Sequence, residues 1–419
     1  MISPKQRSKS GGHDWYPYYA GFSQDFVSHL LETDFKESQD IIDPWNGSGT
    51  TTAVGLKHSR AVTGLDINPV CTVMARGRIM PRSNIASIRP LALKLLAHAQ
   101  ESKIIVREDD MLLEWMRPSS AARVRALDYS IYEHLVSSQT DSRSEIETWT
   151  SQLSPISAFF YCALFAAVRT LFARFKSSNP MWMTKPDSKR QRLGPTWLSI
   201  ERNFIAHLDT LANRLIIEND GDIGPNFSVF TRDISTLKVE ASCFDGAITS
   251  PPYATRIDYV KGAVPELACL GVSASRMRNL RSSSIGTPTL SGWSGSTDSL
   301  MSESAKALVR KVKAHPSKGS SRYYTPWLAT YIEGLQAGFT VLSNSVEKEK
   351  PIAIVVQDSY YKELQIDLQE ITKEIFLFNG RPLVRQVDFP AVRLRSRMNP
   401  RAMKYIRART NRESVLVFK

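Results

Sequence analysis

The chain has 419 residues, of which 42% are hydrophobic and 23% charged; this composition excludes a disordered chain, and the length allows two or three domains. The formal net charge of +13 indicates an acidic partner, most commonly nucleic acid, although some basic proteins are merely soluble. The four cysteines have neither metal-ligand nor disulfide spacing, so we expect no metal site and a reducing environment. The longest apolar run, 158–168, is too short to span a bilayer. We therefore expect a cytoplasmic protein without a membrane partner.

The N-terminal part of the chain has the pattern of a parallel α/β unit. A helical repeat over 22–30 comes before an apolar pair that predicts a short buried strand ending at Asp43. A helix over 50–57 follows through a Gly-rich turn, and a second strand, 61–65, ends at Asp66. Strand, turn, helix and strand in this order are typical of parallel sheets.

A mostly helical insertion over 90–224 interrupts this pattern. Within it, 156–175 has the composition of a buried helix, and leucines recur at helical spacing over 198–215. An insertion of this length must fold as a unit of its own.

The rest of the chain returns to strand and helix patterns. A Ser/Gly/Thr-rich stretch, 282–301, predicts a mobile loop, and 351–356 is the clearest buried strand. Further strands are expected at 227–230, 244–248 and 414–418. Further helices are expected after Tyr253, through 260–270, and at 324–342 and 367–376.

The string Asp-Pro-Trp-Asn-Gly-Ser-Gly-Thr, 43–50, stands where the first strand ends. Gly47 and Gly49 allow backbone conformations closed to other residues, and the helix after them presents free N–H groups. Asp43 is suited to an ammonium group, and Asp66, which ends the second strand, is suited to ribose hydroxyls. The string lacks the Gly-Lys-Ser/Thr ending of a phosphate loop and the three glycines of the dinucleotide fingerprint. A nucleoside cofactor is therefore the better interpretation, although Gly-x-Gly also occurs in ordinary turns.

A second polar corner, Ser250-Pro-Pro-Tyr253, follows the strand 244–248. The prolines remove backbone donors and stiffen the segment, which leaves the Ser250 hydroxyl and main-chain carbonyls as acceptors. Acceptors around one point suit an exocyclic base amine, since accepting from both N–H groups favours a pyramidal nitrogen with an available lone pair. Tyr253 offers a flat face to an extruded base, and we expect this face to matter more than the hydroxyl. The alternative is a rigid turn with a core tyrosine.

Together, 43–50 and 250–253 resemble the cofactor and catalytic motifs of the S-adenosylmethionine-dependent DNA amino-methyltransferases, which methylate cytosine N4 or adenine N6. The usual cofactor motif of that family is Asp-Pro-Phe-x-Gly-Ser-Gly-Thr, in which Trp45 here replaces Phe. Residues 16–23 resemble the family's N-terminal cofactor element. The resemblance covers roughly residues 13–80 and 227–270.

The resemblance implies an α/β fold with a Rossmann-like class I methyltransferase sheet and a large, mostly helical insertion. The implied domains are 1–89 for the N-terminal half with the cofactor motifs, 90–224 for the insertion, a candidate target-recognition domain, and 225–419 for the C-terminal half with the catalytic motif and a flexible basic loop near 280–322.

The resemblance also implies S-adenosyl-L-methionine as the cofactor, held by Phe22, Ser23, Asp43, Pro44, Gly47, Gly49, Thr50, Asp66, Ile67 and Asp233. Asp66 would bind the ribose, Ile67 and Asp233 the adenine, and most of the others the methionine end. We prefer Asp233 to Asp109 or Asp110 because it ends the strand before the catalytic one. The implied catalytic residues are Ser250, Pro251, Pro252 and Tyr253.

Two basic clusters predict phosphate contacts, which supply affinity without sequence choice. The first lies within 306–322, contains no acidic residue and is expected to be a flexible arm. The second lies within 381–412. The residues that we expect to bind nucleic acid are Lys306, Arg310, Lys311, Lys313, Arg393, Arg395 and Arg397. The alternative for each charge run is a solvated surface.

These patterns predict a site-specific DNA methyltransferase with cytosine N4 favoured, because in this family Ser before Pro-Pro leans towards cytosine and Asp towards adenine. The alternatives are an adenine-N6 DNA methyltransferase, an RNA base methyltransferase and a non-catalytic nucleic-acid-binding subunit. No cysteine lies in a nucleophile-like setting, which favours direct transfer to the amine. DNA is the expected partner, and a restriction or defence-system protein is a second candidate.

Overall fold

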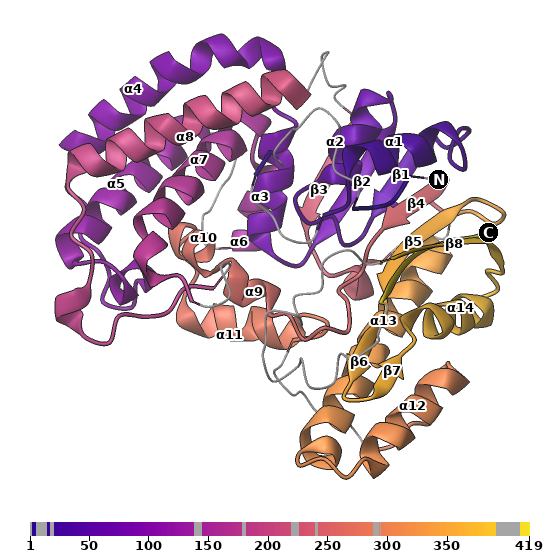
Figure 1. Cartoon of the computed structure of the whole chain (residues 1–419). Coiled ribbons are helices and arrows are strands. Elements are labelled where there is room, and N and C mark those ends of the chain that lie inside the picture. The colour runs from indigo at the N-terminus through magenta and orange to yellow at the C-terminus, as the bar shows by residue number, and fades with distance from the viewer. Residues whose placement is uncertain are drawn as a thin grey trace.

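A seven-stranded sheet of order β3-β2-β1-β4-β5-β9-β8 forms the centre of the fold (Figure 1). Its strands are β1 (Asp40–Asp43), β2 (Ala61–Asp66), β3 (Phe227–Thr231), β4 (Gly246–Thr249), β5 (Ile352–Gln357), β8 (Leu383–Pro390) and β9 (Arg412–Phe418). The strands from β3 to β5 are parallel, and β9 runs antiparallel between β5 and β8. The predicted α/β class with a Rossmann-like sheet is therefore confirmed.

The computed structural model describes residues 2–5, 15–16, 21–137, 145–177, 182–218, 226–238, 242–287, 293, 295–390 and 411–419.

Side chains alternate between the two faces of the sheet and pack into two apolar layers. Ile41 belongs to the layer that α1 and α2 complete, and its neighbour Ile42 belongs to the layer that α13 and α14 complete. These helices are α1 (Gln24–Glu32), α2 (Thr50–Lys57), α13 (Thr325–Ser345) and α14 (Leu368–Phe378).

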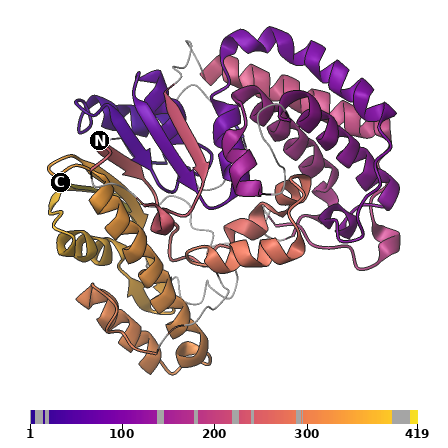
Figure 2. The same ribbon diagram turned by 180° about the vertical axis from the view of Figure 1, so that it is seen from behind.

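The chain between β2 and β3 is helical. Its helices are α3 (Pro69–Arg78), α4 (Ile85–Glu101), α5 (Pro118–Leu135), α6 (Ile146–Gln152), α7 (Pro155–Leu171) and α8 (Trp197–Glu218). Figures 1 and 2 show them gathered beside the β3 edge of the sheet. Most side chains of α7 are buried, and they form the centre of a third apolar core. The large helical insertion of the predicted fold class is thus present.

Two arginines connect this helical core to α10 (Val264–Cys269), which follows the catalytic motif. Arg169 of α7 donates to both carboxylate oxygens of Glu266, with a distance of 2.6 Å from Nη2 to Oε2, and Glu266 is only 2% exposed. Arg125 of α5 binds Asp110 and also donates to two carbonyl oxygens at the end of α10. Buried charge therefore holds α5 and α7 against α10, whose apolar side chains belong to the same core.

The helix predicted after Tyr253, through Val260 to Leu270, is present but interrupted. The structure has two short helices there, α9 (Tyr259–Gly262) and α10, because Pro265 in the first turn of α10 has no N–H to continue the preceding helix. A further helix, α11 (Ala274–Ser283), reaches into the start of the predicted mobile loop 282–301. Part of that loop lies outside the described residues.

The predicted flexible basic arm is also wrong, because most of it is the helix α12 (Glu303–Ala314). Ser302 caps this helix, with its Oγ accepting the N–H of Ala305 at 3.0 Å. Apolar residues at positions 305, 308, 309 and 312 have helical spacing and are buried in the layer with α13 and α14. A π-helix, η6 (Ser320–Tyr324), connects α12 to α13.

The remaining described elements are short. They are the hairpin β6 (Ser359–Tyr361) and β7 (Leu364–Ile366), and the 3₁₀ turns η1 (Arg82–Asn84), η2 (Met111–Glu114), η3 (Ala173–Phe175), η4 (Lys189–Gln191) and η5 (Ile234–Thr236). Within the described ranges, no single helix has the length and apolar composition to cross a membrane; α6 and α7 meet the test only as a pair bent by 118°.

Candidate active site at the switch point of the sheet

The two sequence motifs meet where the strand order of the sheet reverses. β1 and β4 are parallel neighbours, and chain connections lead from them in opposite directions along the sheet. The motif 43–50 follows β1 and the motif 250–253 follows β4, so both lie at the carboxyl ends of adjacent strands. The Thr249 hydroxyl donates to Asp43 Oδ1 at 2.6 Å and connects the two motifs directly. In open α/β sheets this position is where ligands bind.

Both glycines of the cofactor motif are required by the backbone. Gly47 has φ 51° and Gly49 has φ 78°, a left-handed conformation that side chains disfavour. A Cβ on Gly49 would also lie 2.6 Å from the Ala75 Cβ of α3. The turn therefore brings the N-terminus of α2 against α3, where only a hydrogen fits.

Two carboxylates flank this turn. Asp43 is 2% exposed, and burial raises its pKa to about 6 in spite of the hydrogen bonds from Thr249 and the Trp45 N–H. Asp66 is half-buried, accepts from the N–H groups of Asn68 at 2.8 Å and Gly47 at 2.9 Å, and has its pKa raised to about 6 by burial. Because a carboxylate has about four acceptor positions, Asp66 keeps capacity for ligand hydroxyls.

The turn is also fixed from both sides by contacts that the sequence did not predict. Asn46 donates its N–H to the Leu65 carbonyl at 2.9 Å and accepts from the Thr52 hydroxyl at 2.8 Å. Trp45 packs edge-on against Phe339, with ring centroids 5.7 Å apart. A Cβ on Gly338 would lie 2.8 Å from the Trp45 ring, so this glycine makes room for the tryptophan that replaces the usual phenylalanine.

Residues 21–23 of the predicted N-terminal cofactor element lie beside the cofactor motif, whereas 17–20 lie outside the described residues. Ser23 caps α1 by accepting the N–H of Phe26 at 3.2 Å, and its own N–H donates to the Pro4 carbonyl at 2.6 Å. A Cβ on Gly21 would lie 3.7 Å from the Thr50 hydroxyl, which shows how close the two segments are. Phe22 is half-buried. Phe22 and Ser23 therefore lie next to the N-terminus of α2. This position is compatible with their predicted contact with the methionine end of the cofactor.

The residues predicted at the adenine end lie at neighbouring strand ends. Ile67 directly follows Asp66 and is half-buried. The Arg232 N–H donates to the Asp66 carbonyl at 2.9 Å, which brings Asp233 to the end of β3 beside the end of β2. Asp233 Oδ1 accepts from both the N–H and the hydroxyl of Ser235. The rejected candidate Asp110 is bound to Arg125 in the helical core.

This arrangement fits a nucleoside cofactor that carries positive charge. Two carboxylates at adjacent strand ends, a turn that admits no side chain and a helix N-terminus all converge, while no phosphate-binding lysine is present in the turn. S-adenosylmethionine has an ammonium, a sulfonium and ribose hydroxyls, which match these groups. Asp43, Pro44, Gly47, Gly49 and Thr50 would hold the methionine end.

We expect cofactor affinity to fall below pH 6. Since the pKa of Asp66 is raised to about 6, its carboxyl carries a proton below that pH and accepts hydroxyl hydrogen bonds less well. Ligand binding then has to release this proton, which lowers affinity by about tenfold between pH 7 and pH 5. Calorimetric titration with S-adenosylmethionine at several pH values between 5 and 7 measures this change in affinity.

The matched control for this titration is Asp209→Asn at an exposed ion pair on α8, which should titrate like the parent protein. Asp66→Asn should bind weakly with a flatter pH profile. The assignment of Asp66 is wrong if affinity is independent of pH in the parent protein and the Asp66→Asn variant binds as tightly.

The catalytic motif is rigid and half-buried. The Ser250 hydroxyl lies 3.1 Å from the Val355 carbonyl and 3.3 Å from the Tyr253 hydroxyl. The Pro252 carbonyl accepts from the Tyr331 hydroxyl at 2.8 Å, so the Pro251 carbonyl is the better candidate for a substrate amine. Burial raises the pKa of Tyr253 well above 10, which keeps its hydroxyl protonated.

Lys5, Gln357 and Glu413 also belong to this site, and the sequence did not indicate them. Glu413 is 2% exposed, accepts from the Tyr253 hydroxyl at 3.1 Å and forms an ion pair with Lys5 at 2.8 Å. Lys5 also donates to Gln357 at 3.0 Å and lies 5.3 Å from the centroid of the Tyr253 ring. Since these residues lie hundreds of positions apart, no sequence spacing connects them.

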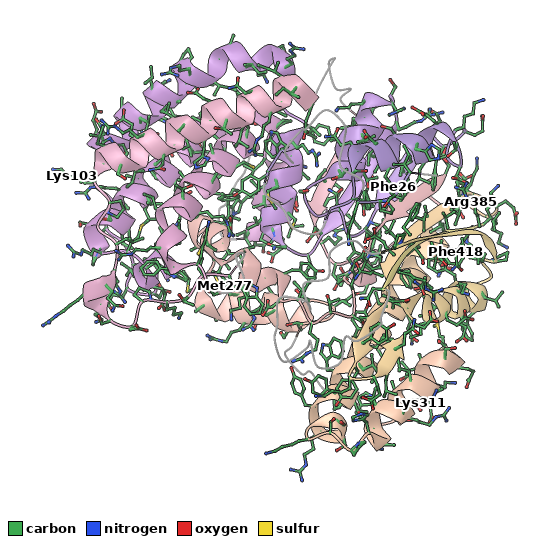
Figure 3. All side chains as sticks on the ribbon, viewed as in Figure 1. Phe26, Lys103, Met277, Lys311, Arg385 and Phe418 are labelled. Atoms are coloured by element: carbon green, nitrogen blue, oxygen red, sulfur yellow. The ribbon has the colours of Figure 1, made fainter. Side chains whose placement is uncertain are left out.

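The basic residues fall into three groups. Arg310, Lys311 and Lys313 are exposed on α12, and Lys306 pairs with Glu303 on the same helix. Figure 3 shows Lys311 on α12, at the opposite end of the molecule from Lys103. Arg393, Arg395 and Arg397 lie outside the described residues.

Arg381, at the start of the second basic cluster, is structural. It is 5% exposed and donates to the carbonyls of Ser343 and Glu347, which hold the end of α13. Arg412, at the other end, pairs with Asp358 and Asp388.

The fold and site define a Rossmann-like methyltransferase class, with a cofactor turn after the first strand and a Ser-Pro-Pro-Tyr loop after the fourth. The chain is 23% identical over 315 residues to the Type II methyltransferase M.BsoBI of Geobacillus stearothermophilus, an alignment that covers 67% of this chain and 57% of that protein. It is 27% identical over 114 residues to the Type II methyltransferase M.MjaII of Methanocaldococcus jannaschii, covering 27% of this chain and 21% of that protein.

No family model matches the chain, and no solved structure gives a significant match. The alignments cover 57% of the length of M.BsoBI and 21% of the length of M.MjaII, so the chain spans only part of each relative. Both relatives are Type II methyltransferases, which agrees with the family predicted from the two motifs, the S-adenosylmethionine-dependent DNA amino-methyltransferases.

Proposed function

We propose that this protein transfers a methyl group from S-adenosylmethionine to an exocyclic amine of a DNA base, with cytosine N4 favoured over adenine N6. The hydrogen bond of 2.6 Å between Thr249 and Asp43 supports this most directly, because it connects the cofactor motif to the catalytic motif. Ser250, rather than aspartate, before the prolines favours cytosine.

The proposed chemistry needs a base that is rotated out of the duplex. Tyr253 then supplies a ring face for stacking, while Ser250 and the Pro251 carbonyl accept from the amine hydrogens. The bound cofactor supplies an electrophilic methyl group on its sulfonium. Because the Pro251-Pro252 segment is rigid, it holds the acceptors in place while the amine attacks.

Nucleoside mass spectrometry of DNA treated with the protein and S-adenosylmethionine tests this proposal. N4-methylcytosine is the expected product. N6-methyladenine would show that the target base is adenine, with the same mechanism of transfer. Methylation of RNA but not DNA, cofactor binding without transfer to either, or 5-methylcytosine as the product would each overturn it. A Ser250→Ala variant should give little product and serves as the inactive control.

We expect the exposed face of α12 to bind DNA phosphates. Replacing Lys311 and Lys313 by alanine should lower affinity about equally on all sequences and reduce the slope of log affinity against log salt by about 2. Fluorescence anisotropy on two unrelated duplexes at several salt concentrations measures both quantities. Lys36→Ala with Lys348→Ala removes the same charge beside the amino ends of β1 and β5, so this control should bind as the parent does. An unchanged slope in the α12 variant would exclude this surface.

A further inference from the structure

The catalytic loop contains no acidic residue, although the reaction must remove a proton. When an exocyclic amine forms a bond to the methyl carbon, the sulfur–methyl bond breaks with its electron pair left on sulfur. The base nitrogen then carries a positive charge until one of its protons leaves. Ser250 accepts from that amine in the proposed function, but a serine hydroxyl is too weak a base to keep a proton. A proton acceptor must therefore come from elsewhere in the fold.

Glu413 of β9 is the carboxylate that the tertiary structure brings to this loop. Its side chain is 3% exposed, and its Oε1 accepts the Tyr253 hydroxyl at 3.1 Å. The Tyr253 hydroxyl in turn accepts from the Ser250 hydroxyl at 3.3 Å. The Ser250 hydroxyl has a second acceptor, the Val355 carbonyl at 3.1 Å. When it donates to Tyr253, both hydroxyls donate in the same direction, from Ser250 towards Glu413. These distances are long for O–H···O bonds, but catalytic hydrogen bonds often tighten only when substrate is bound.

Lys5 makes a buried carboxylate at this position tolerable. Its ammonium lies 2.8 Å from Glu413 Oε1 and is steadied by Gln357 at 3.0 Å. The register partners of Glu413 in the sheet, Gln357 of β5 and Phe389 of β8, carry no charge. Among the residues that the structure describes, Lys5 and Tyr253 are the titratable groups that contact Glu413, and the lysine balances its negative charge before a proton arrives.

We propose that Ser250, Tyr253 and Glu413 form a proton relay that carries the amine proton away from the methylated base. The proton moves from the base nitrogen to Ser250 Oγ, the Ser250 hydroxyl proton moves to the Tyr253 oxygen, and the Tyr253 proton moves to Glu413. The product is a neutral methylamino base, Ser250 and Tyr253 keep one proton each, and Glu413 becomes a carboxylic acid that later releases its proton. The relay rests on the proposed function and changes one expectation from the sequence, since the Tyr253 hydroxyl now matters as well as its ring.

Single-turnover methylation of unmodified DNA, at saturating cofactor and DNA, tests the relay. Tyr253→Phe keeps the ring face but breaks the chain, and Glu413→Gln keeps the shape but accepts no proton. Each should slow the methylation step by about a hundredfold, the usual contribution of a positioned acid or base, while DNA and cofactor dissociation constants stay within about twofold. Because both act in one chain, the double variant should be no slower than the slower single variant.

The pH profile separates a proton acceptor from a residue that only holds the loop. An acid limb in the rate–pH profile of the parent protein should be absent in Glu413→Gln. Tyr161→Phe is the matched control, because it removes a buried tyrosine–carboxylate hydrogen bond of 3.2 Å to Asp128 in the helical core. Its rate and pH profile should be those of the parent.

The outcomes distinguish the relay from the function on which it rests. A parent protein that methylates DNA while Tyr253→Phe or Glu413→Gln retains its rate would overturn the relay alone. Additive losses in the double variant, or an acid limb that persists in Glu413→Gln, would also overturn it. A parent protein that transfers no methyl group to DNA would overturn the proposed function and the relay together.

Discussion

Gly49→Ala should abolish measurable cofactor binding and destabilise the protein. The backbone at this position has φ 78°, which costs a side-chain-bearing residue about 1–2 kcal/mol. The new Cβ would lie 2.6 Å from the Ala75 Cβ and 2.8 Å from its Cα, so α2 and α3 would have to separate. Overpacking of this kind typically costs about 1–3 kcal/mol. Isothermal calorimetry with S-adenosylmethionine and urea unfolding measure the two effects.

Gly380→Ala provides the matched control for this prediction. Gly380 has φ 73°, but a Cβ there would meet nothing within 4 Å. The control should therefore show the conformational cost alone and retain parent-like cofactor affinity. If Gly49→Ala also binds the cofactor with parent-like affinity, the turn 44–50 is not the cofactor site.

Glu266→Ala should lower the free energy of unfolding by about 3–5 kcal/mol, the usual effect of leaving one member of a buried ion pair without its partner. Glu266 accepts from Arg169 through both carboxylate oxygens and from the Tyr16 hydroxyl at 3.2 Å. Without Glu266, the guanidinium loses both carboxylate bonds where α7 packs on α10, while its bond to the Gly262 carbonyl remains. Urea unfolding followed by circular dichroism measures the loss.

Two further variants test the physical reason for this loss. Replacing both Arg169 and Glu266 by methionine removes both charges and should recover much of the stability, because no buried charge is then left without a partner. Asp209→Ala breaks an exposed pair with Arg89 and should change stability by no more than about 1 kcal/mol. A Glu266→Ala loss as small as that of Asp209→Ala would show that the helical core does not depend on this charge.

Parts of the site that follow from local pattern were predictable from the sequence. The turn 43–50 and the loop 250–253 each follow a short apolar strand, and their glycines and prolines restrict the backbone over a few residues. Asp66 belongs to the same local unit. Because parallel strands align their carboxyl ends, motifs that follow such strands meet at one edge of the sheet.

The helical conformation of α12 could have been predicted from the sequence, but a flexible arm was predicted instead. Its positive charges and the neighbouring Ser/Gly-rich stretch suggested a flexible arm, whereas Ala305, Leu308, Val309 and Val312 have the spacing of a buried helical face. The charges occupy the other face of the same helix. Charge alone therefore did not reveal which residues the fold buries, as Arg381 also shows by being buried among carbonyl groups.

Only the tertiary structure decided what surrounds the motifs. Gly338 of α13 makes room for Trp45, and Lys5 and Glu413 reach Tyr253 from the two ends of the chain. Such contacts depend on how the sheet is assembled, because β9 must insert beside β5 before Glu413 comes near the loop after β4. The sequence by itself determined the local backbone of the two motifs, since glycine, proline and strand-end polarity act over neighbouring residues. The sheet order determined the charge and proton acceptors around those motifs, since they come from strands and segments that are distant in the chain.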